Sequence, residues 1–499
     1  MQFLQSAWAL IVNNILTQPA YFIGLLVLLG YVLLRKPWHE VLAGVIKAIV
    51  GYLILGVGSG GLVNNFRPIL VGLKDRFNLD AMVIDPYFGQ NAVTAGVEEV
   101  FGRTFGQVMI LVLIAFIFNI VLVALRKVTK LRSIFTTGHV QVQQASTAFW
   151  LILFAFPNLG DTSILLIMGL ILGLYWAVGS NLTVEPTQDL TDGAGFAIAH
   201  QQMFGLRLFS WLSEKMNKSG QGKSKRLEDL NLPGWLSIFN ENMVATSILM
   251  TIFFGTILVI LGKPYLVEQK FLASDKSFLF YVLTTSLNFA VYLAILQLGV
   301  RTFVAELSAS FHGIQERLLP GAVPGVDCAV SYGFGSPNAV TIGFLFGALG
   351  QFLAIAALIA LRSPVVVIAG FVPVFFDNAT IGVFANNKGG IKAAMLWPFV
   401  AGLCQVFGSA FIASWVGMAA YGGYLGMWDW AVLWPVFTAV MKYLSFAGVA
   451  LIAVALLVIP QLQYRANPDT YFLVTEDYEA YKAKKAEKEA AQLTAAGDD

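Results

Sequence analysis

The chain has 499 residues, of which 57% are hydrophobic and only 12% are charged. Soluble domains carry about 25% charged residues, so this composition excludes an ordinary soluble protein. The formal net charge of +2 does not indicate a nucleic-acid partner, and the two cysteines lie in apolar segments that do not resemble a disulfide framework.

Long apolar runs recur along the whole chain. An α-helix needs about 20 mostly apolar residues to span the hydrocarbon core of a membrane. The run FGQVMILVLIAFIFNIVLVAL, at 105–125, carries no charge and reaches that length. Comparable runs lie near 8–34, 40–63, 161–180, 238–262, 277–300, 338–361, 392–420 and 430–460, with shorter or broken runs near 140–157, 192–205, 321–336 and 364–376. The pattern predicts an all-α polytopic membrane protein.

Basic residues cluster in three connecting segments and predict the orientation of the spans. They lie at 35–39, 126–132 and 215–226, and the positive-inside rule places these loops in the cytoplasm. The segment 64–106 holds four basic and five acidic residues and is expected outside. The N-terminus is then predicted outside and the C-terminus in the cytoplasm, which requires an odd number of crossings, about eleven.

A basic segment divides the chain into two membrane halves of similar character. The predicted parts are a first half at 1–212, a cytoplasmic linker at 213–232, a second half at 233–428, a last transmembrane helix at 429–463 and a polar cytoplasmic tail at 464–499. DGAGFAIAHQQ (192–202) and DNATIGVFANN (377–387) align without a gap. This weak similarity predicts an inverted repeat, in which broken helices build a site at mid-membrane.

Polar side chains gather in two places beside predicted helix breaks. TTGHVQVQQAS places His139 and Gln143 one helical turn apart, with Gln144 beside Gln143. AIAHQQMFG places His200 directly before a glutamine pair. Such side chains can simply hydrogen-bond neighbouring helices together. Two groups of the same kind, both beside breaks, favour the alternative of a polar ligand cavity.

Asp327 is a third candidate, because it lies in the apolar, glycine-rich segment PGVDCAVSYGFGSPNAV. A charged residue at the centre of a membrane helix costs about 2.5–3.5 kcal/mol, so it indicates a function unless it caps a helix or forms an ion pair. Ser336 and Pro337 predict the N-cap and first residue of the next helix. The N-terminus of that helix would favour an anion in the same region.

Enzyme motifs are missing from the sequence, which contains no HExxH pair, no Walker A loop and no two-cysteine zinc pattern. The His-x-x-x-Gln spacing lacks a carboxylate or thiolate companion, and glutamine is a poor ligand for transition metals. We therefore predict no metal and no cofactor. The residues do not exclude Asp327 as an ion site, so a proton- or sodium-coupled secondary transporter stays open at this point.

Longer motifs resemble those of one known family. They are GYVLLRKPWHEVLAGVIKAIVGYLILGVGSG, RSIFTTGHVQVQQAS, EPTQDLTDGAGFAIAHQQ, DLNLPGWLSIFNEN, GVRTFVAELSASFHGIQERLLPGAVPGVDCAV and NATIGVFANNKGG. From about residue 15 to about residue 460, the chain is similar to the L-ascorbate-specific permease, or IIC component, of the bacterial phosphoenolpyruvate-dependent phosphotransferase system.

The resemblance implies a homodimer in the bacterial inner membrane. Each subunit of eleven helices would have a scaffold domain that holds the dimer and a core domain that carries the sugar across the bilayer as a rigid body. It also implies uptake of L-ascorbate (vitamin C) with phosphorylation by a cytosolic IIB protein, which is supplied by a IIA protein. Neither Cys328 nor Cys404 lies in a soluble segment, so the chain is expected to be the non-catalytic permease subunit, with IIA and IIB as separate polypeptides.

The resemblance further implies a set of substrate contacts. On the matching motifs they fall on Ser59, Tyr87, His139, Gln143, Gln144, His200, Gln201 and Asp327. Glutamine amides both donate and accept, which suits a ligand with several hydroxyls. We expect Asp327 to accept from a substrate hydroxyl and to assist phosphoryl acceptance there, because a carboxylate repels the ascorbate enolate. The alternative function is an ion-coupled transporter of ascorbate or a related sugar acid.

Overall fold

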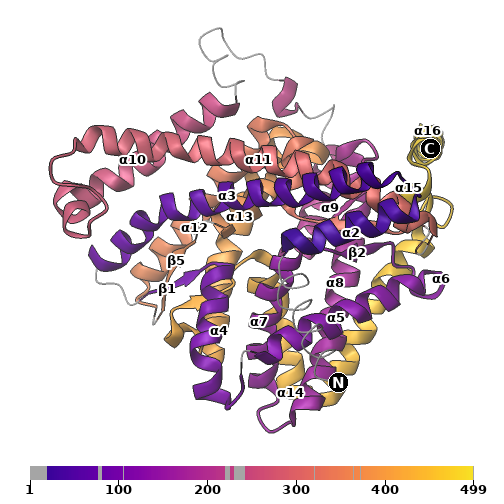
Figure 1. The fold of residues 1–499 in the computed structure, drawn as a ribbon, viewed down its shortest axis with the longest axis horizontal. Coiled ribbons are helices and arrows are strands. Elements are labelled where there is room, and N and C mark those ends of the chain that lie inside the picture. The colour runs from indigo at the N-terminus through magenta and orange to yellow at the C-terminus, as the bar shows by residue number, and fades with distance from the viewer. Residues whose placement is uncertain are drawn as a thin grey trace.

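The computed structural model describes residues 19–76, 81–104, 106–219, 225–229, 242–317, 319, 321–363, 365–370 and 372–497. Helices dominate these residues (Figure 1). The longer helices are α2 (Pro19–Leu33), α3 (Trp38–Arg76), α4 (Pro86–Phe101), α5 (Gly106–Ala124), α7 (Gly138–Ala155), α8 (Asp161–Thr191), α9 (Met203–Ser219), α10 (Asn242–Glu268), α11 (Phe278–Arg317), α12 (Pro337–Ala360), α13 (Asn378–Val416), α14 (Trp428–Ala466) and α16 (Tyr478–Gly497). Two four-residue helices, α6 (Arg126–Thr129) and α15 (Leu473–Glu476), complete the set of α-helices in the described ranges.

Several helical segments have the length and composition of membrane spans. Five of them meet both criteria within the described residues: Trp38–Gly58, Asp161–Thr191, Pro337–Ala360, Pro373–Val416 and Trp428–Ala466. Shorter apolar segments lie at Ile23–Leu33, Ile110–Ala124 and Phe278–Tyr292. The predicted class, an all-α polytopic membrane protein, is confirmed, and the total of about eleven crossings stays a prediction.

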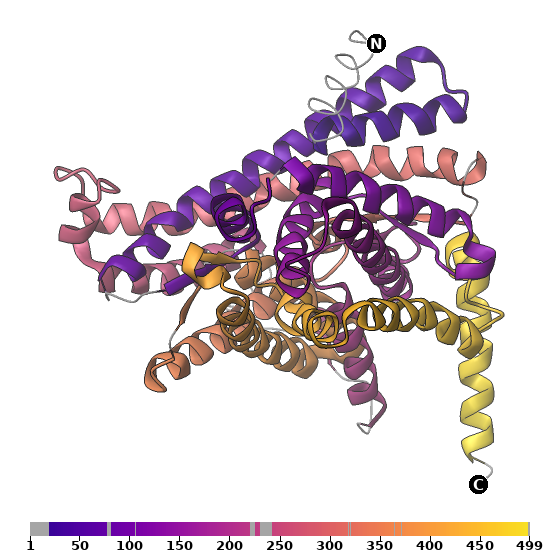
Figure 2. The same cartoon turned by 90° about the horizontal axis from the view of Figure 1, so that it is seen from below.

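The helices pack in two groups (Figures 1 and 2). In the first group, α3 packs along α11, with α2 and α10 against this pair. The second group consists of α4, α5, α7, α8, α9, α12, α13 and α14. The α11 helix of the first group contacts the segment around residues 323–333, so the two groups meet where the chain carries Asp327.

Six short strands in the described residues form two parallel sheets inside the second group. They are β1 (Ala81–Ile84), β2 (Ser133–Phe135), β3 (Ala197–Ile198), β4 (Val323–Val326), β5 (Val366–Ala369) and β6 (Gly423–Tyr424). One sheet has the order β2-β4-β3 and the other the order β5-β1-β6, and all pairings are parallel. In each sheet, one half of the chain therefore supplies the middle strand and the other half supplies both outer strands.

This exchange of strands supports an internal repeat, but in a different alignment from the predicted one. In each half the middle strand is followed directly by an aspartate, Asp85 after β1 and Asp327 after β4. The alignment of 192–202 with 377–387 is wrong, because the first segment is a turn leading into β3 and the second is helical. Shared composition misled the comparison, since Asp192 has a left-handed backbone (φ 54°) after α8 while the backbone at Asp377 is helical.

Glycines bring α12 and α13 into close contact in the second group. A Cβ atom on Gly343 of α12 would lie 2.7 Å from the Asn378 carbonyl oxygen of α13. The hydrophobic effect does not drive apolar helices together inside a lipid bilayer. Small residues instead allow two helices to approach closely and to gain van der Waals contacts. The π-helical turn Pro373–Asp377 precedes α13 and presents the Phe376 carbonyl oxygen toward the loop after β3.

The C-terminal segment, residues 467–497, packs against the starting end of the β2-β4-β3 sheet. Val474 and Tyr481 form a small apolar cluster with Val184, Ala197 and Val323. Lys485 Nζ lies 2.8 Å from the Asp189 carboxylate of α8, which adds an ion pair to this contact. The first part of the predicted polar tail therefore packs on the protein, whereas α16 continues to Gly497 and extends away from the helix groups (Figure 2).

Candidate functional site

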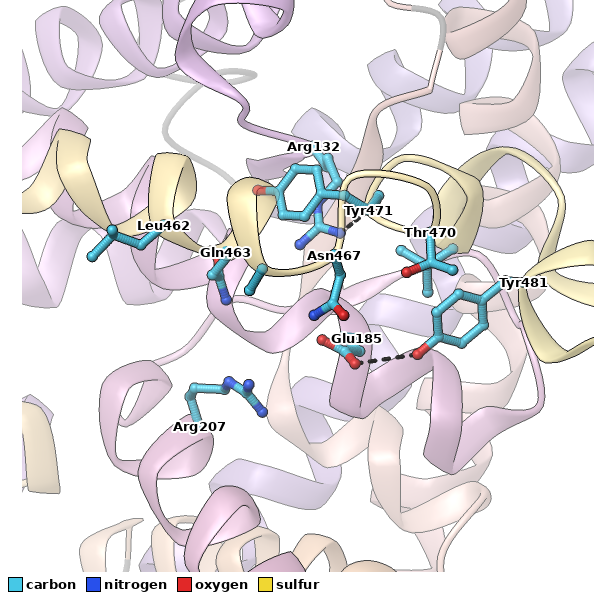
Figure 3. Close-up of a pocket in the computed structure, with 11 residues that line it drawn as sticks. Arg132, Glu185, Arg207, Leu462, Gln463, Asn467, Thr470, Tyr471 and Tyr481 are labelled. Carbon is cyan, nitrogen blue, oxygen red and sulfur yellow. Dashed lines mark hydrogen bonds between the residues drawn. The ribbon is translucent and has the colours of Figure 1, made fainter. Parts of the chain in front are cut away.

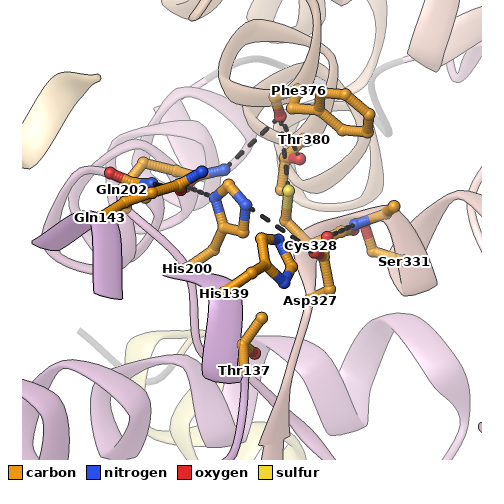
Figure 4. A network of polar contacts seen from close by, with 12 residues as sticks. Thr137, His139, Gln143, His200, Gln202, Asp327, Cys328, Ser331, Phe376 and Thr380 are labelled. Atoms are coloured by element: carbon orange, nitrogen blue, oxygen red, sulfur yellow. Dashed lines mark hydrogen bonds and ion pairs between the residues drawn. The ribbon is translucent and has the colours of Figure 1, made fainter. Parts of the chain in front are cut away.

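The carboxyl ends of three parallel strands bring distant polar residues together. Strands β2, β4 and β3 run in the same direction, so their carboxyl ends lie at one edge of the sheet. His139 follows β2 as the second residue of α7, Asp327 follows β4 directly, and His200 follows β3. Ligands often bind at this edge of parallel sheets. Figure 4 shows the three side chains facing one another.

Asp327 lies at the centre of the group. Its Oδ2 atom is 3.3 Å from His139 Nε2 and 3.9 Å from His200 Nε2. Its Oδ1 atom accepts a hydrogen bond from the Ala329 backbone N–H at 2.9 Å. Asp327 and His200 are buried, whereas the His139 side chain keeps 25% of its surface exposed. His139 is therefore the most exposed of the three residues in the cluster.

The hydrogen bond of His200 leaves the cluster with more acceptors than donors. His200 Nδ1 lies 2.9 Å from Gln202 Oε1, and an amide oxygen can only accept, so Nδ1 carries the proton. In the neutral ring, Nε2 is then an acceptor that faces the Asp327 carboxylate. A hydroxyl placed between Asp327 and His200 would supply the missing donor.

A second unsatisfied acceptor lies in the glutamine pair beside His200. Gln201 Nε2 donates to Gln143 Oε1 at 2.8 Å, which joins the loop after β3 to α7. Gln201 Oε1 is buried and has no hydrogen-bond partner among the described residues. Buried polar atoms are seldom left unpaired, so this oxygen indicates a ligand or water donor.

Gln144 has a different position from Gln143. Its Oε1 atom accepts from Trp176 Nε1 of α8 at 2.6 Å, and its Nε2 atom donates to the His200 carbonyl oxygen at 3.1 Å. Both ends of this amide therefore contact protein groups. Gln144 holds the backbone of His200 in place between α7 and α8.

Tyr52 reaches the site from α3, in the first helix group. Its hydroxyl lies 2.5 Å from His139 Nδ1, and its ring is 5.7 Å from that of Phe303 on α11. When His139 Nε2–H donates to Asp327, the neutral ring accepts from the Tyr52 hydroxyl at Nδ1. Tyr52 was missed from the sequence, because an isolated tyrosine in an apolar helix carries no signal. Gln202 belongs to the glutamine pair that the sequence indicated, but it was not among the predicted substrate contacts.

Two predicted contacts lie beyond the described side chains. Ser59 belongs to α3 and Tyr87 to the first turn of α4, but their side chains are outside the described part of the structure. The Tyr87 backbone follows β1, a strand of the other sheet. Both residues stay predictions.

The cluster also has the spacing of a metal site. The ligand atoms of His139, His200 and Asp327 all lie within 4.8 Å of one another. The sequence argument against a metal was that the histidines lack a neighbouring carboxylate. That argument is wrong, because the sheet brings Asp327 next to both histidines. The absence of a metal stays a prediction, and it needs a direct test.

Buried histidines, glutamines and a carboxylate between two groups of membrane helices define a membrane permease, in which polar groups inside the bilayer mark a substrate path. Residues 14–431 match the family described as the PTS (phosphotransferase system) sugar-specific permease component. The chain belongs to this family and is a multi-pass membrane protein.

The chain is also similar to a protein named "Ascorbate-specific PTS system EIIC component" from Mycoplasma pneumoniae (strain ATCC 29342 / M129 / Subtype 1). The two are 34% identical over 435 residues, which cover 79% of this chain and 64% of that protein. The match thus spans less than two thirds of the relative's length. It agrees with the family that the sequence motifs predicted.

Proposed function

We propose that this protein is the permease subunit that takes up L-ascorbate in a phosphotransferase system. The observation that carries the proposal is the excess of buried acceptors at the ends of β3 and β4, where His200 Nε2 faces the Asp327 carboxylate and Gln201 Oε1 has no hydrogen-bond partner among the described residues. L-Ascorbate brings several hydroxyl donors on a small ring. The relative's printed name supports the same substrate.

The anionic end of ascorbate needs a partner of opposite sign. The N-terminus of α7 provides one, because helix N-termini carry a partial positive charge and the Thr137 side chain does not cap this one. His139 lies in the first turn of α7 and is the exposed member of the cluster. We place the enolate toward α7 and the hydroxylated side chain toward Asp327, with Gln143 and Gln201 contacting the ring oxygens and Gln144 holding His200.

The position of Asp327 also supports the proposed coupling to phosphorylation. A carboxylate that accepts the proton of a substrate hydroxyl makes that oxygen a better phosphoryl acceptor. A separate cytosolic IIB protein would donate the phosphoryl group, and a IIA protein would recharge it. In this proposal the group of α2, α3, α10 and α11 is the scaffold of a homodimer, and the second group is the core that carries ascorbate by an elevator-type movement.

The proposed orientation places the N-terminus outside and the C-terminus in the cytoplasm of the bacterial inner membrane. Support comes from contacts between the basic loop after α5 and the C-terminal segment. Arg126 Nη2 lies 2.6 Å from Glu476 Oε1, and the Tyr471 hydroxyl donates to the Lys130 carbonyl oxygen. These contacts support the proposal that the loop and the C-terminal segment lie on one side of the membrane, which the positive-inside rule predicts to be the cytoplasmic side.

Equilibrium binding of labelled L-ascorbate to the purified protein tests the proposal. Saturable binding to the wild type is expected without sodium, and Gln143→Ala should weaken it by about 10-fold or more. The reason is that the change removes both the amide proposed to contact a ring oxygen and the acceptor that positions Gln201, and each hydrogen bond contributes about 0.5–1.5 kcal/mol. Gln269→Ala is the matched control, because Gln269 is exposed just after α10. The readout is the dissociation constant.

The same experiment distinguishes the alternatives. A requirement for sodium would favour ion-coupled transport, and loss of binding in a chelator would show that binding needs a metal, for which His139, His200 and Asp327 are the candidate ligands. Absence of saturable binding by the wild type would contradict the proposed substrate.

Tyr52→Phe is expected to weaken ascorbate binding by about 3- to 10-fold, with only a small decrease in the thermal unfolding midpoint. One neutral hydrogen bond contributes about 0.5–1.5 kcal/mol, and its loss frees His139 to adopt the other tautomer.

Tyr443→Phe is the control for this change, since Tyr443 on α14 is 75% exposed. Equal affinity of the Tyr52→Phe variant and the wild type for ascorbate would show that Tyr52 does not position His139.

A further inference from the structure

A second polar pocket lies at the opposite end of the β2-β4-β3 sheet from the proposed ascorbate site. It has a volume of about 270 Å³ and is enclosed by α8, α9, the end of α14 and the C-terminal segment (Figure 3). Arg132, which lines it, directly precedes β2, whereas the ascorbate site lies after β2. The pocket is therefore separate from the substrate cluster.

Arg132 is a buried cation held at the wall of this pocket. Its Nε atom donates to Asn181 Oδ1 at 3.1 Å, and its Nη1 atom donates to the Tyr471 carbonyl oxygen at 2.5 Å. The guanidinium lies 3.6 Å from the centre of the Tyr471 ring. These contacts fix its plane, and the Nη2 group has no hydrogen-bond partner among the described residues.

Arg207 of α9 lines the same pocket from the other side. It makes no hydrogen bond or ion pair with any residue that the structure describes, although it is only partly exposed. Glu185 is the acidic residue of the lining, and its carboxylate accepts from the Tyr481 hydroxyl at 3.2 Å. Two guanidinium groups thus face one carboxylate, which leaves an excess of one positive charge in the lining.

The local electrostatics favour an added anion. Burial lowers the pKa of the Arg132 guanidinium, and the charge of Arg207 contributes to the same lowering. An anion between the two would relieve their repulsion and replace lost hydration. Neutral groups are also available, because Asn467 Oδ1 already accepts from Lys488, which leaves its amide hydrogens to donate.

We propose that this pocket binds a phosphate group. Guanidinium forks match the tetrahedral oxygens of phosphate, which can engage Arg132 and Arg207 at the same time. The source is either a phosphate monoester from the cytosol or the headgroup of an anionic lipid, since the pocket adjoins the last turn of the membrane-crossing helix α14. An occupied pocket would fasten the C-terminal segment to α8 and α9. This inference does not depend on the identity of the transported sugar.

The test measures the thermal unfolding midpoint of the purified full-length protein against ligand concentration. One arm adds inorganic phosphate or a phosphate monoester in detergent, with sodium chloride at equal ionic strength as the control. The other arm compares nanodiscs of phosphatidylglycerol with nanodiscs of phosphatidylcholine. Arg207→Gln is the test variant, and Arg465→Gln is the matched control, because Arg465 is an exposed arginine near the pocket that does not line it.

Phosphate should raise the midpoint of the wild type and of Arg465→Gln, and Arg207→Gln should need at least 10-fold more phosphate for the same rise. A response only to phosphatidylglycerol, again lost in Arg207→Gln, supports the site with lipid as its source. No response in either arm overturns the proposal, and so does an unchanged response of Arg207→Gln. If Arg207→Gln does not fold, Thr470→Val, which removes a hydroxyl of the lining, is compared in the same way.

Discussion

Asp327→Asn is expected to weaken L-ascorbate binding by about 100-fold and to stop phosphorylation by the IIB protein. Hydrogen bonds to a charged group contribute about 1.5–3 kcal/mol. In the variant, the asparagine NH₂ group would face His139 Nε2–H, which needs an acceptor and not a second donor. The proton of the substrate hydroxyl then has no base to accept it. Binding of labelled ascorbate and single-turnover phosphorylation measure the two effects separately.

The control for this variant is Asp469→Asn, at an exposed position after α14. The side-chain oxygen that the Asp327→Asn change retains can still accept from the Ala329 N–H, so the local turn should survive. Wild-type binding together with wild-type phosphorylation in the Asp327→Asn protein would remove Asp327 from both proposed roles.

Asp429→Ala is expected to cause the largest loss of stability, about 3–5 kcal/mol in all, because it leaves three buried donors without an acceptor, each at a cost of about 1–3 kcal/mol. Asp429, on α14, accepts from the Tyr175 hydroxyl at 2.7 Å and from the backbone N–H groups of Phe204 and Gly205 at 3.1 and 3.0 Å. These two N–H groups belong to the first turn of α9, so an aspartate from another helix caps α9.

The unfolding midpoint and the yield of monodisperse protein measure this effect, with Asp469→Ala as the control. Since α9 begins directly after the loop that carries His200 and Gln201, folded Asp429→Ala protein should also bind ascorbate weakly. A midpoint equal to that of the wild type would mean that the cap contributes no stability.

Continuous apolar runs made the helices predictable. The run at 105–125 became α5 and the run at 338–361 became α12, each within two residues at both ends. Ser336 and Pro337 begin α12 as predicted, although the Ser336 side chain makes no capping hydrogen bond. The strands were missed because two to four residues are too few to show an alternating pattern.

The site was only partly predictable, for the same reason. Helical spacing placed His139 beside Gln143, and both lie in α7. The approach of Asp327 to His139 depends on the pairing of β2 with β4, which no local pattern encodes. Asp429 resembled an ordinary residue at a helix start, and its contacts with α9 come from tertiary packing.

The exchange of middle strands has a consequence for biosynthesis. β1 ends at residue 84, but its partners β5 and β6 are translated only after residue 365. In the other sheet, β2 and β3 cannot pair with β4 until residues 323–326 have been translated. Neither sheet can close until most of the chain has left the ribosome, and such long-range pairing is slow to form. A product of interrupted translation that ends before β4 therefore lacks Asp327 and cannot form the sheet that brings His139 and His200 together.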